Sequence, residues 1–586
     1  MGLTTAGLSY WQGEPAEIPL LNMTVGDLLD HRAEELPSSE AVVYSGYPEY
    51  GGALDLRWTY RDLRERAEAV ARGLLALGLQ KGEHIAVWAV NLPEWLLLEM
   101  AAAKAGLVLV TVNPVLRARE VEYVLRQGDV AALFFMARVR DHDCLETVQR
   151  LTTPAGPPGA VRSEVLPCLR YVCLLGPVPD ALAQQRTWRP ALFRELIAAG
   201  GAVPLEALRE RQRSLSPDDV VQIQYTSGTT GFPKGAMLTH RNVLNNAMLF
   251  VRRSAGLPHD RVCNPMPFFH TAGCVLAVLG CLYMGTTLVP MLAFDPLKTL
   301  QIVSSERCTL LGAVPTMLLA LLQHPDFGRY DLSTLRVVTC GGAPVPLTLM
   351  QQVKERIGAD ITIVYGLTES SPVITQTLPR DSFELKASTV GVPLPYTDVK
   401  IVDPASGAVV PCGTPGELCC RGYLVMKGYY KMPEKTAETI DAEGWLHTGD
   451  LATMDEQGYV RIVGRLKEMI IRGGENIYPA EIEDFLLQHP GVAEAQVIGV
   501  PDPFFGEEIA AVIRPREGAQ VSAEELRAFC QGQISHQKVP RYFLFTHNFP
   551  MTASGKVQKF LLREQAIKEL GLQQARPERI REVPGS

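Results

Sequence analysis

The sequence predicts a large N-terminal α/β domain, residues 1–465, followed by a small α+β domain, residues 466–586. Two observations predict this fold class. Helical and β-strand patterns alternate in the first third of the chain, as is typical of parallel sheets that helices cover on both faces. From residue 494 on, short elements follow one another quickly, which indicates a compact unit of about 120 residues with its own core.

The first elements of the large domain are predicted from capping and periodicity. Residues 59–79 form a helix, because Thr59 and Asp62 have the spacing of a capping box and apolar residues recur on one helical face. The next elements continue the alternation and are a strand at 84–90, a helix at 93–106 and a strand at 107–112.

Residues 265–294 contain no Asp, Glu, Lys or Arg and are the one candidate for a membrane span. A spanning helix needs about 20 unbroken apolar residues, and Gly280 and Pro290 interrupt this stretch. We therefore expect a buried helix near 271–284 followed by a strand near 286–291, and no transmembrane segment.

The small domain is predicted as alternating short elements around one core. Its elements are a helix at 478–491, strands at 494–500 and 508–514, a helix at 523–534 and a strand at 542–546.

Composition excludes several classes of protein. The formal net charge is −8, and no run is rich in Lys and Arg, so we expect no nucleic-acid partner. The 12 cysteines include no CxxC pair, which argues against a zinc finger and for reduced, mostly buried thiols. Glu14 and Glu17 precede the first basic residue, Arg32, which fits neither a signal nor a transit peptide and predicts a cytoplasmic location.

Residues 225–240, YTSGTTGFPKGAMLTH, are typical of a loop that holds phosphate. Backbone N–H groups can converge on an anion there, and Lys234 can supply charge. This segment differs from a Walker P-loop, in which the lysine follows a glycine, precedes Ser or Thr and begins a helix. Here Pro233 and Gly235 flank the lysine, and strand-like residues lie on both sides of the loop. A different nucleotide site and a polar hairpin with a solvated lysine both stay open at this point.

The stretch TSGTTGFPKG resembles the phosphate-binding loop of the adenylate-forming superfamily, which includes acyl-CoA synthetases, luciferases and adenylation domains. The superfamily's other segments follow in its order as CGGAP (340–344), YGLTE (365–369), GELCCRG (416–422), TGD (448–450), GRLKEMIIRGGENIYPAEIE (464–483) and PMTASGKVQK (550–559). The resemblance runs from about Thr24 to Leu570 and looks closest to the medium-chain fatty acyl-CoA ligases. It implies α-β-α-β-α layering with a small β-barrel-like part, and a mobile C-terminal domain.

The reaction that the resemblance implies has two halves. A carboxylate attacks the α-phosphate of MgATP, and the thiol of coenzyme A then replaces AMP. The implied substrates are a fatty acid, ATP and coenzyme A, and Mg²⁺ is the implied metal. Peripheral association with membranes through the acid stays open.

The resemblance also assigns site residues. Those implied to bind ATP and AMP are Thr226, Ser227, Gly228, Thr229, Thr230, Gly231, Lys234, Gly235, Gly342, Ala343, Pro344, Tyr365, Gly366, Asp450 and Arg465. Within this set Tyr365 stacks on adenine, while Asp450 and Arg465 hold the ribose. A core tyrosine, a turn-capping aspartate and a surface ion pair are the plain structural alternatives.

The implied catalytic residues are Lys556, Thr368, Glu369 and His270. Lys556 reaches the carboxylate and the α-phosphate, and Lys559 is expected to be a bystander. Glu369 is the implied ligand of Mg²⁺. His270 borders the carboxylate end of the acyl pocket, and an ordinary core histidine is its alternative.

The last implied positions concern the movement of the small domain. Lys467 is the implied hinge, and Gly473 and Gly474 are implied to line the path of coenzyme A, with a plain β-turn as the alternative. Other functions left open are an aryl or other small-acid CoA ligase, an enzyme that loads a carrier protein, and a non-catalytic nucleotide- or acyl-binding relative. The one Asp–Ser pair, Asp381–Ser382, lacks the flanking residues of a phosphopantetheine site, so no fused carrier is expected.

Overall fold

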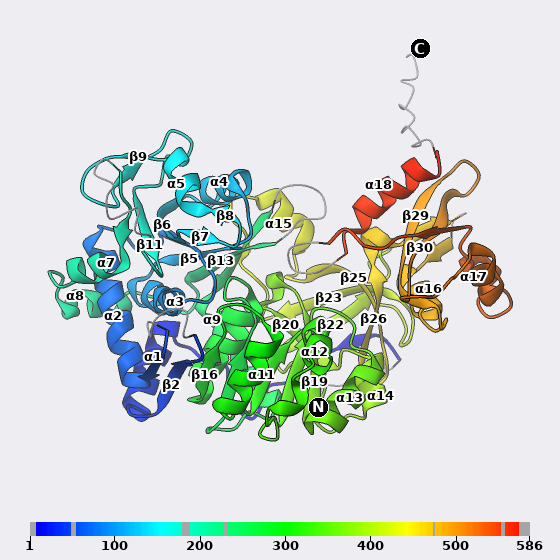
Figure 1. Ribbon diagram of the computed structural model, residues 1–586, viewed down its shortest axis with the longest axis horizontal. Helices are drawn as coiled ribbons and strands as arrows, with labels where there is room; N and C mark the ends of the chain where they lie inside the picture. Colours follow the sequence, from blue (N-terminus) through cyan, green and yellow to red (C-terminus); the bar gives the residue numbers. More distant parts are fainter. Residues whose placement is uncertain are drawn as a thin grey trace, which may run out of the picture. The chain divides into compact units, whose positions relative to one another are not determined.

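A computed structural model describes residues 7–47, 54–178, 188–226, 233–472, 475–551 and 557–572 (Figure 1). By its internal contacts the chain divides into two compact units. The larger contains Met1–Lys400, Cys419–Thr448 and Met454–Arg461, and the smaller contains Ile401–Leu418, Gly449–Thr453 and Ile462–Ser586. Each unit is described by itself. The boundary after residue 465 and the β-barrel-like part stay predictions.

The first sheet of the larger unit is parallel over most of its width. Its order is β12-β11-β6-β4-β5-β13-β14-β24, and only the pairs β13–β14 and β14–β24 are antiparallel. In the same order, the strands are Ala191–Leu192, Tyr171–Leu175, Val130–Met136, His84–Trp88, Val108–Val112, Val220–Thr226, Lys234–Thr239 and Gly428–Tyr429.

The second sheet of the larger unit has the order β21-β20-β19-β18-β17-β15-β16-β2-β3. Its strands are Val392–Pro393, Val373–Gln376, Asp360–Gly366, Val337–Gly341, Leu310–Ala313, Arg261–Asn264, Thr287–Pro290, Glu40–Tyr44 and Leu56–Thr59. The strands from β19 to β2 run parallel, and the flanking strands are antiparallel. Parallel strands end at one edge of a sheet, and this edge carries the candidate site.

Helices cover both faces of the first sheet, as the alternation of patterns predicts. On β4, Ile85 and Val87 face the core shared with α2 (Tyr60–Ala76) and α3 (Pro93–Ala105). Ala86 and Trp88 face the opposite core. That opposite core includes residues of α4 (Ala118–Gln127) and α5 (Cys144–Leu151). The predicted α/β class is therefore confirmed.

A middle layer of helices packs against strands of both sheets. It contains α1 (Val25–Glu35), α2, α3, α9 (His240–Arg253), the π-helix η2 (Ala272–Leu279) and α10 (Gly280–Met284). On the second sheet lie α11 (Pro296–Ser305), α12 (Pro315–Leu322) and α13 (Leu347–Ile357) (Figure 1). The predicted capping box is present, since Thr59 accepts from Asp62 N–H and the Asp62 side chain accepts from Thr59 N–H.

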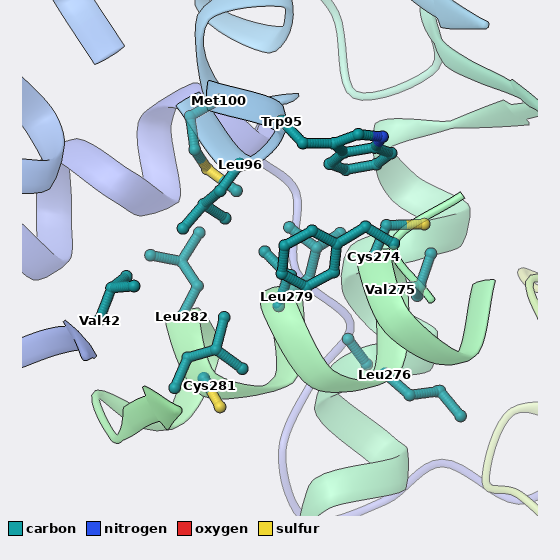
Figure 2. Packing of buried hydrophobic residues seen from close by; sticks show 14 of the residues in the cluster. Val42, Trp95, Leu96, Met100, Cys274, Val275, Leu276, Leu279, Cys281 and Leu282 are labelled. Atoms are coloured by element: carbon teal, nitrogen blue, oxygen red, sulfur yellow. The ribbon is translucent and has the colours of Figure 1, made fainter. Parts of the chain in front are cut away.

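The uncharged stretch forms part of the buried core. Figure 2 shows Leu96 of α3 facing Leu282 of α10, and Trp95 facing Cys274 of η2. The predicted helix and following strand are confirmed, although the helix begins with two turns of π-helix. Within the part of the chain that the structure describes, every helix is too short or too polar to span a bilayer.

The smaller unit contains the predicted α+β module. Its sheet has the order β28-β27-β30-β29, with β31 parallel to β30. The elements are β27 (Ile470–Arg472), β28 (Glu475–Ile477), α16 (Pro479–Leu486), β29 (Val492–Asp502), β30 (Gly506–Pro515), α17 (Ala523–Cys530), β31 (Tyr542–Phe545) and α18 (Lys559–Glu569). The helices α16 and α18 both pack on β29, and each predicted helix of this module ends several residues earlier than expected.

Candidate active site

The residue predicted to border the acid substrate and the residues predicted to bind adenine lie at the carboxyl edge of the second sheet. His270 follows β15, Gly342, Ala343 and Pro344 follow β18, and Tyr365 and Gly366 end β19. The parallel register places Gly341 beside Val364, so the first two of these loops and the end of β19 lie at the same edge. The 342–344 segment is exposed, and such an edge is where ligands bind in open α/β sheets.

His270 is exposed, which excludes the alternative of a core histidine. Its Nδ1 accepts from the N–H of Ala272 at 3.2 Å, and its carbonyl oxygen accepts from the N–H groups of Gly273 and Cys274 at 2.9 and 3.1 Å. The residue therefore sits at the start of η2 with its backbone held by that helix. Its ring stands at the solvent-accessible edge of the sheet.

Glu369 and Lys234 are joined by a residue that sequence reasoning missed. Lys234 Nζ donates to Tyr429 Oη at 2.9 Å and lies 4.1 Å from the centre of its ring. Tyr429 Oη donates to Glu369 Oε1 at 2.7 Å. Burial and the nearby Glu369 carboxylate raise the pKa of Tyr429 far above its ordinary value, so this hydroxyl keeps its proton.

The strand order explains this contact. Tyr429 lies on β24, the neighbour of β14, on which Lys234 is the first residue. Glu369 lies in a short 3-10 turn, Thr368–Ser370, directly after β19, and Thr368 is half-buried there. A Gly-Tyr-Tyr segment alone does not reveal which strand it pairs with. The contact of Tyr429 with Lys234 and Glu369 therefore cannot be predicted from the sequence and is seen only in the structure.

The phosphate-loop prediction falls mostly outside the described residues. Ser227, Gly228, Thr229, Thr230 and Gly231 are among these undescribed positions. Both ends of the loop are described, since Thr226 ends β13 and pairs with Lys234 at the start of β14. The predicted strand–loop–strand context is confirmed, and the helix that a Walker loop requires is replaced here by a strand.

Gly235 has a packing reason to be glycine. A Cβ atom there would lie 2.7 Å from Ile223 Cγ2 and 3.2 Å from Tyr225 Cζ. These distances are shorter than van der Waals contact, so a side chain would push β14 away from β13. The glycine thus keeps Lys234 in register with Thr226.

In the smaller unit the two predicted ribose residues contact each other. Arg465 Nε lies 3.0 Å from Asp450 Oδ1, and the Asp450 side chain is 6% exposed while that of Arg465 is 43% exposed. The structure therefore brings together two residues that are 15 positions apart in the sequence, as the resemblance implies. Their role toward a nucleotide stays a prediction.

The predicted hinge and coenzyme A positions are described in part. Lys467 is exposed and lies in the short 3-10 turn η5, Leu466–Glu468. Gly473, Gly474 and Lys556 lie outside the described residues. Lys559 is described, and its half-buried side chain pairs with Glu468 and Glu483.

Comparison with known proteins gives the family. The family described as "AMP-binding enzyme" matches residues 29–430, and "AMP-binding enzyme C-terminal domain" matches residues 481–556. The chain is 48% identical to a putative acyl-CoA synthetase, YngI, of Bacillus subtilis, over 94% of this chain and 99% of that protein. It is 42% identical to the mitochondrial medium-chain acyl-CoA ligase ACSF2 of Homo sapiens, over 97% and 91% of the two chains.

A solved structure agrees with both findings. ATP-bound MatB from Rhodopseudomonas palustris superposes with a TM-score of 0.77 and 29% identity, covering 94% of this chain and 100% of that one. The motifs, the strand order and the full-length relatives all point the same way. The chain therefore belongs to the AMP-binding enzyme family, the adenylate-forming superfamily that its motifs resemble.

Proposed function

We propose that this enzyme is an ATP-dependent fatty acyl-CoA ligase that acts on medium-chain acids. An oxygen of the carboxylate attacks the α-phosphorus of ATP, the bond to the β-phosphate oxygen breaks, and acyl-adenylate and pyrophosphate form. The sulfur of coenzyme A then attacks the acyl carbonyl. The thiol loses its proton, and AMP departs with the bonding electrons.

The observation that carries this proposal is the identity to acyl-CoA ligases along nearly the whole chain, 48% and 42% in two relatives. An identity confined to the nucleotide-binding segments would support adenylation alone. Here it extends through the C-terminal module, which the second half-reaction requires.

Residues of the larger unit account for the first half-reaction. Lys234 and the hydroxyl groups of the preceding loop hold the phosphates that leave as pyrophosphate. Tyr365 stacks on adenine at the end of β19, and Thr368 donates to the α-phosphate. Positive charge and donors fixed in advance are what such a reaction needs, because an anion must approach a polyanion.

Glu369 fits a magnesium ion. Its carboxylate is a hard oxygen donor at the end of β19, it is half-exposed, and Tyr429 orients one of its oxygens. Bound Mg²⁺ would neutralise part of the phosphate charge. Lys234 would then share the phosphates with the metal.

The smaller unit supplies the remaining groups. Asp450 accepts hydrogen bonds from the ribose hydroxyls, and Arg465 holds that carboxylate in place. Lys556 supplies charge to the reacting carboxylate and α-phosphate. Rotation of the backbone at Lys467 then exchanges Lys556 for the Gly473–Gly474 segment, along which coenzyme A reaches the adenylate. The cytoplasmic location stays a prediction.

A substrate panel tests the proposal. Purified enzyme is supplied with MgATP, coenzyme A and one acid at a time, and pyrophosphate release and acyl-CoA are both measured. The panel contains straight-chain acids from short to long and a set of benzoates. We expect the largest kcat/KM in the medium-chain group, because each buried methylene contributes about 0.8 kcal/mol until the pocket is full.

Each alternative has its own outcome in this panel. A profile that favours benzoates indicates an aryl-CoA ligase. Pyrophosphate release without acyl-CoA, restored to turnover by a carrier protein, indicates a carrier-loading enzyme. Absence of pyrophosphate release with every acid overturns the proposal altogether.

A further inference from the structure

Helix α9 of the larger unit carries two adjacent asparagines, Asn245 and Asn246, whose side chains are both 0% exposed. A buried amide is stable only when its donor and acceptor groups find partners, so the partners show what each side chain holds in place. Each of the two bonds both main-chain groups of one residue that is far away in the sequence. Asn245 bonds Leu21, and Asn246 bonds Val373.

Asn246 holds the start of β20. Its Nδ2 donates to the carbonyl oxygen of Val373 at 2.8 Å, and its Oδ1 accepts from the N–H of Val373 at 3.0 Å. The same Nδ2 lies 3.5 Å from the carbonyl oxygen of Ser370, the last residue of the turn that contains Glu369. The main chain that leaves this turn is therefore fixed to α9.

Another asparagine of α9 holds the segment that leads to Tyr429. Asn242 Nδ2 donates to the carbonyl oxygen of Tyr423, and it donates to that of Val425 at 3.2 Å. Asn242 and Asn246 are one helical turn apart, so they project from the same face of α9. This face of the helix thus holds both of the segments whose side chains meet in the Glu369–Tyr429 hydrogen bond.

The two segments are also joined to each other directly. Ser371 Oγ donates to the carbonyl oxygen of Leu424 at 2.7 Å, and the N–H of Met426 donates to that of Glu369 at 2.9 Å. The main chain of Glu369 is therefore held from two sides, while Tyr429 holds its carboxylate. Contacts of this outer kind orient a metal ligand without touching the metal.

We infer that Asn246 is a positioning residue for the Glu369 carboxylate. By bonding both main-chain groups of Val373, it sets the path of the chain that leaves the turn, and hence the direction in which Glu369 offers its oxygens to Mg²⁺. The inference rests on the proposed function, because the magnesium role of Glu369 comes from it. It adds that α9, a helix of the buried middle layer, orients the metal ligand through the main chain.

Asn246→Leu and Asn245→Leu form a matched pair. Leucine has nearly the shape of asparagine, and each change removes one buried amide from the same helix and leaves one distant residue without its two bonds. We therefore expect both variants to lower the melting temperature by similar amounts. Only Asn246→Leu should disturb the metal site, because Leu21 does not lead to Glu369.

The first readout is nucleotide binding without turnover. Calorimetry measures the Kd of an ATP analogue that carries a methylene group in place of the oxygen between the α- and β-phosphates, once with Mg²⁺ and once with EDTA. Metal and nucleotide bound at one site raise each other's affinity by the same factor. We expect Asn246→Leu to weaken binding at least fivefold with Mg²⁺ and less than twofold with EDTA. For Asn245→Leu we expect less than twofold in both.

The second readout is the Mg²⁺ concentration needed for half-maximal pyrophosphate release. We expect Asn246→Leu to raise it about tenfold, as replacement of an outer partner of a metal ligand typically does. Saturating Mg²⁺ should return the rate to within threefold of the wild-type rate. Asn245→Leu should leave the requirement within twofold. A purely structural defect would lower the rate at every Mg²⁺ concentration.

Should Asn246→Leu fail to fold, Asn246→Ser and Asn245→Ser replace the pair, and the first alone should weaken Mg²⁺-dependent binding at least threefold. Equal weakening with Mg²⁺ and with EDTA, or the same effect of both members of a pair, overturns the inference and leaves the proposed function intact. A wild-type enzyme that binds the analogue equally with and without Mg²⁺ also overturns the inference. A wild-type enzyme that shows Mg²⁺-dependent binding but activates no acid overturns the proposed function alone.

Discussion

Tyr429 holds the two opposite charges of the candidate site at a fixed separation. Its hydroxyl accepts from Lys234 and donates to Glu369, so both groups are kept in place by one side chain. A residue that orients a metal ligand without touching the metal typically changes metal affinity 10- to 100-fold when it is replaced. The geometry therefore makes Tyr429 part of the proposed phosphate and magnesium site.

Replacing Tyr429 by Phe should raise the Mg²⁺ concentration needed for half-maximal pyrophosphate release by about tenfold. The reason is that Glu369 loses its orienting donor while the ring remains to pack under Lys234. A magnesium titration of pyrophosphate release measures this. Tyr430→Phe is the matched control, because the neighbouring hydroxyl donates to Asp129 instead, at 2.8 Å. An unchanged magnesium requirement in Tyr429→Phe would contradict the assignment.

Asp450 is the other residue whose charge we expect to matter. Asp450→Asn should raise KM for ATP by about 10- to 100-fold, because a hydrogen bond to a charged group is worth about 1.5–3 kcal/mol. The KM for the acid should stay the same. The control is Asp455→Asn, since Asp455 caps a turn by accepting from the N–H groups of Gln457 and Tyr459. Equal effects of the two variants would favour the turn-capping alternative.

At the scale of elements, the junction of β19 and β20 depends on a single glycine. A Cβ atom at Gly366 would lie 1.8 Å from the carbonyl oxygen of Pro372 and 2.9 Å from Ile374 N. Backbone atoms cannot move aside as a flexible side chain can. The turn that carries Thr368 and Glu369 is therefore built on a position that excludes any side chain.

Gly366→Ala should lower the free energy of unfolding of the larger unit by about 1–3 kcal/mol or more, as overpacking does. Thermal unfolding followed by circular dichroism measures the change. Gly312→Ala on β17 is the control, because the nearest atom to its added Cβ is Met266 Cγ at 3.7 Å, an ordinary contact. Equal melting temperatures for the two variants would show that the Pro372 carbonyl yields.

Patterns in neighbouring residues predict most helices and strands. Contacts between residues that are far apart in the sequence cannot be predicted from such patterns. The capping box at Thr59 and the start of the helix at Pro93 can both be predicted from residues that are close together in the sequence. The π-helix η2 was not predicted, because a helix that is apolar on nearly every side has no polar face from which its period can be read. Lys234 and Tyr429 are 195 positions apart, and only the order of strands brings them together.

At the scale of the whole molecule, the sequence predicts a single domain boundary, after residue 465, between a large α/β domain and a small α+β domain. The contacts assign Ile401–Leu418 and Gly449–Thr453 to the smaller unit as well. Strand pairing between distant segments decides such a division, and no local pattern announces it. The residues Asp450 and Arg465 fall in the same unit for this reason.

The stability of the larger unit should depend on pH through His240. This side chain is 2% exposed, its Nδ1 accepts from the N–H of Val25 at 3.1 Å, and burial lowers the pKa of His240 to about 4. The ordinary value is 6.5. Between these pH values the unfolded chain binds a proton that the folded chain does not, so stability is lost as pH falls.

The expected loss between pH 7 and pH 5 is about 2 kcal/mol. Melting temperatures measured across this range should fall more steeply for the wild-type enzyme than for His240→Asn, whose side chain accepts the same hydrogen bond and does not titrate. Parallel curves for the two proteins would show that other groups govern the pH dependence.

At the carboxyl edge of the second sheet, substitutions that affect the acid and substitutions that affect the nucleotide fall in different segments of the chain. His270, in the segment that follows β15, borders the proposed acid pocket, whereas the segments that follow β18 and β19 carry the proposed nucleotide residues. Each segment is anchored by its own strand, so substitutions in the segment near the acid can leave the conformation of the nucleotide segments unchanged. A lineage with this architecture can drift to new acids while its energy source stays constant.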